Sequence, residues 1–357
     1  MAKLSDILSI TSLETQIDSG AINRVRHPDK PLAHLIYNKQ CNLTDIYPWT
    51  HEMRLCRGLV YDTNTYEVVA RPYAKFFEYN DGRYPETWSE NLPHEIPTLT
   101  EKVDGSLGIV YMYNGELCVN SMRAFGSDVA VWAKHWFDTY HTELVVPKGY
   151  TMCAEIMNKN NTVVIRHAEE KCVALGLIEI DTGKEMPRQD FEQWCGKNNI
   201  EAVKVYSTPM EVALGEDIKD REGYVATYPD GTKVKIKFDT YKALHRIAMG
   251  ANSNTVWEMM REGKHEYLRK AYGVLTGEKR LWLIETINQI GGKYSAIVQR
   301  AYTILEGMPE GLDKKQSAAY INQFPEYAAL CFMIMKKQYY RDLVYKRCRP
   351  QSLTGAF

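Results

Sequence analysis

The chain has 357 residues, of which 45% are hydrophobic and 25% charged, which is the composition of a folded globular protein and not of a disordered one. No stretch approaches the roughly 20 apolar residues of a membrane span, and none of the eight cysteines stands in a C-x-x-C pair, so we expect neither a membrane segment nor a zinc site. The net charge of −1 is uneven, because residues 251–357 hold 16 Lys and Arg against 10 Asp and Glu, whereas residues 1–250 hold 28 against 35.

Short β-branched and aromatic runs fill the chain from about residue 55 to residue 240. Turn-forming pairs such as Asn114-Gly115 and Asp230-Gly231 separate these runs. Two stretches between them, 127–144 and 187–199, have the apolar periodicity of helices. Hairpins interspersed with helices predict an α+β domain with antiparallel sheets. The expected strands are 58–62, 67–73, 108–113, 116–122, 172–180, 223–228 and 233–238.

After about Lys242 the periodicity of the sequence becomes helical. Four segments carry an apolar stripe, and glycines, including Gly291-Gly292, separate several of them. We therefore predict two domains, 1–250 and an all-helical, basic 251–357, whose charge suits a polyanionic partner. The four helical segments are 254–275, 277–290, 294–308 and 325–348.

The stretch EKVDGSLG places Lys102 two residues before an Asp-Gly turn. A lysine beside such a turn is ordinarily solvated, and a pattern as short as K-x-D-G also occurs by chance. A lysine with a neutral amine is, however, a nucleophile. Other features of the chain bear on the choice between these two interpretations.

The hairpin EGYVATYPDGTKVKIKF gathers charge at one sheet edge. A two-residue turn at Asp230-Gly231 predicts that Tyr224 lies opposite Lys237, with Glu222 close to both. Strand alternation places three lysines on one face, and the alternative is an ordinary solvated face. These lysines are Lys233, Lys235 and Lys237.

Three further charged residues have neighbours that suggest a binding site. Glu155 is embedded in an apolar strand, where it needs a metal ion, a ribose hydroxyl or a lysine as its partner. Arg57 precedes a strand, and Lys75 precedes Phe76 and Phe77, so these residues can hold phosphate and stack on a base. The alternatives are a plain salt bridge for Glu155, a surface ion pair for Arg57 and core positions for both rings.

In chain order these segments resemble the motifs of the covalent nucleotidyltransferases, and most closely those of the phage-type RNA ligase 1 family. EKVDGSLG resembles the first motif of the superfamily, CAEIMN the third, EGYV the fourth and KVKIK the fifth. The RNA ligase 1 branch is favoured by CRGLVYD, RPYAKFF and EGYVATYPDGTKVKIKFDTYKALH. The resemblance covers residues 57–245 and implies a nucleotidyltransferase domain followed by helices, without an OB-fold.

The resemblance implies a role for each matching residue. Lys102 would attack the α-phosphate of ATP, with a pKa lowered by Lys235, Lys237 and a bound metal. Lys235 and Lys237 would also act in catalysis by neutralising phosphate charge. Glu222 would hold Mg²⁺ or Mn²⁺, and Glu155 would hold the same metal or the ribose. The expected nucleotide-binding residues are Arg57, Lys75, Phe77, Asp104, Gly105, Arg123, Glu155, Lys235 and Lys237.

Two segments depart from the family pattern. SMRAFGS stands where the family has a Ser-Lys-Gly-Ser signature, and Arg123 is its nearest cation. Aliphatic Leu175 and Leu177 occupy the strand after the third motif, where many relatives carry an aromatic residue against the adenine. The residue that stacks on the adenine is therefore unassigned from the sequence.

The resemblance implies an ATP-dependent RNA ligase that joins 5′-phosphate and 3′-hydroxyl ends through lysyl-AMP and RNA-adenylate, in the repair of cleaved tRNA. We expect a cytoplasmic monomer, cellular or phage-encoded and acting in a host. The rival functions are another covalent nucleotidyltransferase, such as an mRNA-capping guanylyltransferase or a DNA ligase, and a non-catalytic RNA-binding module. The last predicted helix offers basic and aromatic side chains that could contact RNA phosphates and bases, and the alternative is an ordinary solvated helix. These residues are Lys336, Lys337, Tyr339, Tyr340, Arg341, Tyr345, Lys346, Arg347 and Arg349.

Overall fold

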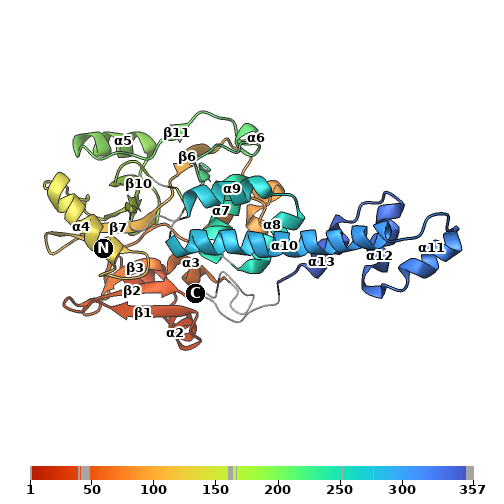
Figure 1. Cartoon of the computed structure of the whole chain (residues 1–357). Coiled ribbons are helices and arrows are strands. Elements are labelled where there is room, and N and C mark those ends of the chain that lie inside the picture. The colour runs from red at the N-terminus through yellow and green to blue at the C-terminus, as the bar shows by residue number, and fades with distance from the viewer. Residues whose placement is uncertain are drawn as a thin grey trace. The chain divides into compact units, whose positions relative to one another are not determined.

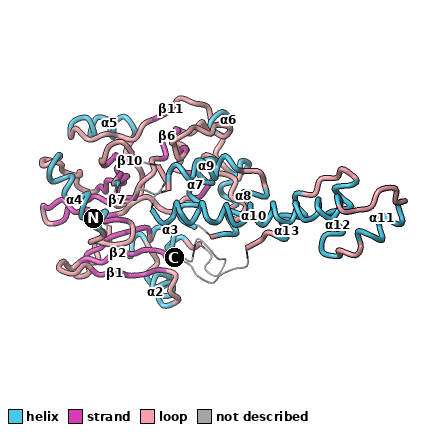
Figure 2. Tube along the Cα trace, viewed as in Figure 1, coloured by secondary structure: helices cyan, strands magenta, loops and turns pink. Residues whose placement is uncertain are grey.

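The computed structural model describes residues 2–38, 41, 49–159, 164–165, 167–250, 252–275 and 277–350. The chain divides into two compact units, residues 1–241 and residues 242–357 (Figure 1). All the strands that the structure describes lie in the first unit, and the second unit is built of helices (Figure 2). Among the described residues, no helix is both long and apolar enough to cross a membrane. The predicted α+β fold class with a helical C-terminal region is confirmed.

The first sheet has the order β1-β2-β3-β4 and is antiparallel throughout. Leu13, Leu35 and Leu59 share a buried cluster beneath this sheet. Because β3 starts at Arg57, the sheet fixes the position of that side chain. The strands are β1 (Ile22–Arg26), β2 (Leu32–Tyr37), β3 (Arg57–Asp62) and β4 (Val68–Ala70), and the neighbouring helices are α1 (Leu4–Ile7), α2 (Ile10–Asp18) and α3 (His51–Leu55).

The second sheet has the order β10-β9-β7-β8 and is also antiparallel. Asn114 and Gly115 both have positive φ and form the predicted two-residue turn between β7 and β8. Phe137 and Phe191 from the two covering helices are buried in a common cluster with this sheet. The elements are β7 (Ser106–Tyr113), β8 (Glu116–Ser121), α4 (Asp128–Tyr140), β9 (Tyr150–Met157), β10 (Lys171–Glu179) and α5 (Arg188–Lys197).

The third sheet, β11-β6-β12-β13-β5, carries the predicted lysine hairpin. Its pairings are antiparallel except that of β5 with β13, which is parallel. Val234 and Ile236 are buried and the lysines between them are half-buried, as the alternation predicted. The elements are β5 (Phe77–Glu78), two short 3₁₀ helices (Pro85–Thr87 and Ser89–Asn91), β6 (Thr98–Lys102), β11 (Val205–Tyr206), α6 (Met210–Ala213), β12 (Gly223–Thr227) and β13 (Lys233–Lys237).

The register of the β12–β13 hairpin differs by one residue from the prediction. Gly223, and not Tyr224, lies opposite Lys237. The loop contains three residues, because the Tyr228 N–H donates to the Thr232 carbonyl at 2.8 Å and Gly231 adopts a φ of 90°. This is the common alternative to the two-residue turn. The shift turns Tyr224 to the reverse face of the sheet and places a glycine beside Lys237.

Helices after β13 differ from the prediction at three points. The predicted helix 254–275 is divided after Arg261, and Gly263 in the break has a φ of 74°. The longest helix passes through Gly291-Gly292 without a break, since burial of Leu283, Ile290 and Ile304 offsets a cost of about 1 kcal/mol per helical glycine. The predicted helix 325–348 is interrupted instead, at Lys337, where φ is 52°. The elements are α7 (Asp239–Gly250), α8 (Ser253–Arg261), α9 (His265–Val274), α10 (Gly277–Glu306), α11 (Lys314–Ile321), α12 (Pro325–Met335) and α13 (Arg341–Arg347).

Candidate active site

Lys102 is the last residue of β6, in the interior of the third sheet. Its Nζ lies 2.8 Å from Oε1 of Glu222, and the same oxygen lies 3.3 Å from Nζ of Lys237. The Glu222 side chain is only 4% exposed. One buried carboxylate oxygen therefore joins Lys237, which the sequence placed near Glu222, to Lys102, which stands in a separate segment of the chain.

Gly223 separates these two lysines across the sheet. It lies opposite Lys102 on one side and opposite Lys237 on the other. Its φ is 147°, and a Cβ atom at this position would collide with the carbonyl oxygen of Ile236. Only glycine accepts this combination of backbone angle and crowding. Glu222 therefore supplies the carboxylate of the site, and Gly223 supplies the space that lets strands β12 and β13 approach at this point.

Lys235 lies on the same strand face, in strongly cationic surroundings. Burial, together with the charges of Lys75 and Arg57, lowers the pKa of Lys235 well below its ordinary value. Its Nζ lies 4.9 Å from the ring centre of Phe76. An anion, such as a phosphate group, is the ligand that this environment favours.

Lys233 is engaged in a separate network. Its Nζ lies 2.6 Å from Oε2 of Glu185 and 2.7 Å from Oγ1 of Thr227. The Tyr73 hydroxyl donates to the other Glu185 oxygen at 2.6 Å. Lys233 therefore pairs with Glu185. The other two lysines of this strand face, Lys235 and Lys237, lie in the same charged cluster as Lys102.

Glu155, in β9, adds a second carboxyl group to the site. Burial raises the pKa of Glu155 to about 8, the charge of Lys102 opposes this shift, and the charge of Glu222 adds to it. In the part of the chain that the structure describes, no three His, Cys, Asp or Glu side chains form a group that could hold a metal ion unaided. Two carboxylates completed by substrate oxygens are, however, a common way to bind Mg²⁺, so Glu155 and Glu222 fit such an ion.

The pKa of Lys102 is raised, and not lowered as the sequence analysis predicted. Burial disfavours the ammonium form, but the charges of Glu222 and Glu155 outweigh burial and raise the pKa of Lys102. The prediction considered Lys235, Lys237 and a bound metal, and it missed the direct contact of Lys102 with a carboxylate. Lys102 is therefore an ammonium ion held by Glu222 at neutral pH.

Phe76 is the ring that borders Arg57 and Lys235, whereas Phe77 borders Arg54 and Lys75. The guanidinium of Arg57 lies 5.4 Å from the centre of Phe76, and its buried Nε has no hydrogen-bond partner among the described residues. Phe77 is 5% exposed and stacks on Tyr84, with ring centres 3.7 Å apart. Phe77 is therefore a core residue, and the expectation that it contacts a nucleotide moves to Phe76.

Lys75 stands over three aromatic rings, with its Nζ 5.4–5.5 Å from the centres of Tyr37, Trp49 and Phe77. Burial, and then the charges of Arg57 and Lys237, lower the pKa of Lys75 to about 7. The amine of Lys75 therefore changes charge near neutral pH, unlike an ordinary lysine.

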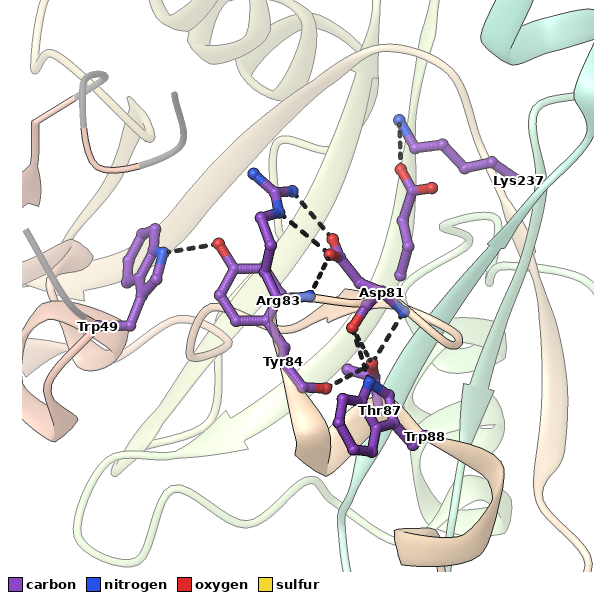
Figure 3. A network of polar contacts seen from close by, with 8 residues as sticks. Trp49, Asp81, Arg83, Tyr84, Thr87, Trp88 and Lys237 are labelled. Atoms are coloured by element: carbon purple, nitrogen blue, oxygen red, sulfur yellow. Dashed lines mark hydrogen bonds and ion pairs between the residues drawn. The ribbon is translucent and has the colours of Figure 1, made fainter. Parts of the chain in front are cut away.

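A polar network stiffens the loop beside Lys237 (Figure 3). The Trp49 indole donates to the Tyr84 hydroxyl at 3.2 Å, and the Trp88 indole donates to the Asp81 carbonyl at 3.0 Å. The Asp81 carboxylate also pairs with Arg83. The loop is thus pinned by its own aromatic and acidic residues, next to the Lys237 amine.

Asp104 and Gly105 shape the loop after Lys102. The buried Asp104 carboxylate accepts hydrogen bonds from the N–H groups of Val164 and Ile165, at 3.0 and 2.7 Å, and from the Tyr241 hydroxyl at 2.7 Å. A Cβ atom on Gly105 would lie 2.6 Å from the carbonyl oxygen of Ile156. Asp104 therefore holds the loop in place through its hydrogen bonds. Gly105 is needed because strand β9 passes close to it, whereas the sequence analysis expected a nucleotide to approach it closely.

Arg123 is exposed in the turn after β8, where its N–H donates to Ser121 Oγ at 3.4 Å. The structure gives no contact between its guanidinium and the lysine cluster among the described residues. The sequence analysis did not identify Tyr241 as a partner of Asp104. It named Phe76 only together with Phe77, as one of two rings that could stack on a base. The signal for Tyr241 was its place in the FDTYKALH segment, directly after the hairpin.

Comparisons with known proteins match this chain to RNA ligases. The chain is 24% identical over 203 residues to a "Putative RNA ligase" of Thermovibrio ammonificans, a match covering 54% of this chain and 53% of that protein. It is 23% identical over 238 residues to a "Putative bifunctional polynucleotide kinase/RNA ligase" of Autographa californica nuclear polyhedrosis virus, covering 59% of this chain and 34% of that protein. The chain thus spans about half the length, or less, of these relatives.

Among solved structures, an archaeal ATP-dependent RNA ligase is 13% identical, with a TM-score of 0.49 over 88% of this chain and 86% of that one. A family model described as RNA ligase matches residues 55–241, slightly more than half of the 357 residues. The match contains Lys102, Glu222 and Lys237, and it confirms the resemblance found in the motifs. This chain belongs to the RNA ligase family.

Proposed function

We propose that this protein is an ATP-dependent RNA ligase in which Lys102 carries AMP. The observation that carries the proposal is the 2.8 Å contact between Lys102 Nζ and Glu222 Oε1, in the interior of a sheet and within the residues that match the family. A buried lysine that meets a carboxylate and further cations at one site is arranged for reaction with a polyanionic phosphate. The rest of the proposal follows from the groups around it.

In the first step the Lys102 amine attacks the α-phosphorus of ATP. A phosphorus–nitrogen bond forms, the bond to the bridging oxygen breaks, and pyrophosphate leaves. The amine must first lose a proton to solvent, and Glu222 opposes this loss because its charge raises the pKa of Lys102. Lys237, 3.3 Å from the same Glu222 oxygen, can take over that carboxylate when Lys102 becomes neutral.

Other cations would stabilise the phosphate charge. Lys235 and Lys237 project from one face of β13, and Arg57 has a buried Nε free to donate. Preorganised donors of this kind stabilise negative charge that grows in a transition state. Phe76, beside Arg57 and Lys235, would border the nucleotide.

A divalent cation, Mg²⁺ or Mn²⁺, fits Glu222 and Glu155 when substrate oxygens complete its shell. When bound, it would neutralise charge on the triphosphate. Glu155, whose pKa is raised to about 8, would bind such an ion in its deprotonated form. If Glu155 instead stays protonated, it can donate a hydrogen bond to a ribose oxygen.

In the later steps AMP would pass from Lys102 to the 5′-phosphate of an RNA, and a 3′-hydroxyl would then displace AMP and seal the strand. The positive balance of residues 251–357 supports a role for this part in holding RNA, and cleaved tRNA is the substrate we propose. We further propose that the enzyme acts as a monomer in the cytoplasm.

Incubation of the protein with α-³²P-ATP and Mg²⁺, followed by denaturing electrophoresis, tests the proposal. We expect an acid-labile, protein-bound label, and its transfer to 5′-phosphorylated RNA. Label from GTP in place of ATP would indicate a capping enzyme, and sealing of nicked DNA but not RNA would indicate a DNA ligase. No covalent label with any nucleotide would leave the non-catalytic RNA-binding module as the better account.

A further inference from the structure

The reverse face of the third sheet carries an aromatic box that nothing in the proposed reaction uses. The Arg221 guanidinium lies 4.3 Å from the ring centre of Tyr206, 4.9 Å from that of Tyr224 and 5.7 Å from that of Phe238. The rings also touch one another edge to face, Tyr206 with Tyr224 and Tyr224 with Phe238. We call this set of four residues the Arg221 box.

Arg221 is held by three ring faces together with a side-chain hydrogen bond to Tyr224. Its buried Nε and Nη2 atoms have no hydrogen-bond partner among the described residues. Buried N–H groups without a partner are costly, and they are retained only when other interactions compensate for them. Three aromatic faces supply that compensation through cation–π attraction. The position of this side chain is therefore fixed by the rings.

The box is linked by the backbone to both partners of the central ion pair. Arg221 directly precedes Glu222, whose carbonyl accepts a hydrogen bond from the Phe238 N–H at 2.9 Å. The Tyr206 hydroxyl donates at 3.1 Å to Glu101, which directly precedes Lys102. Side chains of consecutive strand residues point to opposite faces, so Glu101 lies behind Lys102.

We propose that Arg221 is a positioning residue for the proposed lysyl-AMP reaction. By locking the segment before Glu222 onto Tyr206, which also holds Glu101, the box sets the distance between Lys102 and Glu222 from the reverse side of the sheet. The inference rests on the proposed function. Arg221 itself touches neither the ion pair nor, on this account, the nucleotide.

The test measures single-turnover lysyl-AMP formation at a range of ATP concentrations. For Arg221→Ala we expect a maximal rate about 10-fold lower and an unchanged ATP concentration for half-maximal rate. Arg221→Lys, which keeps a cation between the rings, should recover most of the rate. Lys204→Ala is the matched control, because Lys204 is an exposed cation 4.8 Å from the same Tyr206 ring, and it should change the rate less than 2-fold.

A double-mutant cycle separates positioning from general loss of structure. If Arg221 acts through Glu222, Arg221→Ala should slow the Glu222→Gln protein less than 2-fold. A full 10-fold effect in that background would overturn the inference. If Arg221→Ala does not fold, Tyr206→Phe keeps the ring and removes only the hydroxyl that holds Glu101. It should lower the maximal rate several-fold at an unchanged ATP concentration for half-maximal rate, and a wild-type rate would overturn the inference.

Failure of the inference and failure of the proposed function give different results. A labelled wild-type protein with an undiminished rate in Arg221→Ala overturns the inference alone. A wild-type protein that forms no lysyl-AMP overturns both.

Discussion

The cations of the lysine cluster and those of the helical tail differ in their surroundings, although the sequence presents both as basic clusters. Lys102 and Lys237 are 20% and 18% exposed and share one buried carboxylate oxygen. In the second unit, Lys336, Lys337 and Lys346 are exposed. Burial brings the lysines of the cluster into direct contact with a carboxylate, whereas the tail lysines face solvent. The cluster therefore has the buried ion pairs of a candidate active site, and the tail lysines have the exposure of a candidate binding surface.

Within the tail, some of the basic and aromatic residues contact other helices and some are left exposed. Arg341 donates to the Met260 carbonyl at 2.6 Å, and Arg347 donates to the Glu326 carbonyl at 2.9 Å. Tyr345 is 5% exposed and accepts a hydrogen bond from the Trp257 indole through its carbonyl. These residues, which the sequence offered as RNA contacts, brace the helices. The exposed lysines, Tyr339 and Arg349 are left as candidates for RNA contact.

The largest effect should come from Lys102→Ala, which removes the proposed nucleophile. We expect complete loss of protein-bound AMP. The protein should remain folded, because Glu222 keeps Lys237 as its partner. Labelling and thermal unfolding of the variant check both points. Lys134→Ala, which removes an exposed lysine paired with Asp138, is the control and should label normally. Persistent label on Lys102→Ala would show that another residue accepts AMP.

Glu222→Gln and Lys237→Ala should each slow lysyl-AMP formation by about 10²–10³-fold, the usual cost of removing one preorganised group. Single-turnover labelling measures this effect. Lys219→Ala, a fully solvated lysine near Glu222 in the sequence, should leave the rate unchanged. Rates near that of the wild type in both site variants would mean that the ion pair is structural.

A smaller effect should appear in the pH dependence of ATP binding. The pKa of Lys75 is lowered to about 7, so its positive charge is present below that pH and is lost as the pH rises through it. The ATP concentration for half-maximal labelling should therefore rise several-fold between about pH 6 and pH 8, because the phosphates of ATP lose one positive partner over this range. Lys75→Arg, whose charge persists, should flatten this rise. An identical profile in the two proteins would remove Lys75 from the binding site.

The smallest effect should come from the tail. Replacing Lys336, Lys337 and Lys346 singly by alanine should leave lysyl-AMP formation unchanged and weaken RNA binding a few-fold. Each lost phosphate contact should reduce the salt dependence by a slope of about 0.7 for single strands. Binding titrations at several salt concentrations measure that slope, with Lys134→Ala as the control. An unchanged slope in all three variants would exclude these lysines from the RNA-binding surface.

The sequence by itself determined features that depend on neighbouring residues. Strand alternation in KVKIK correctly placed Lys235 and Lys237 on one face, because side-chain direction in a strand is a local property. The Asn114-Gly115 turn was correct for the same reason, since two residues suffice to form it. The order of the motifs was also sufficient to identify the family.

Only the tertiary structure decided the properties that depend on distant segments. The register of the β12–β13 hairpin was not predictable from Asp230-Gly231, because several loop lengths are compatible with the same pair. The raised pKa of Lys102 depends on Glu222, 120 positions away in the chain, and the choice of Phe76 over Phe77 depends on Tyr84 and Arg57. Charge and burial act through space, so a pattern of residue types names the participants in a site but not their distances or their protonation.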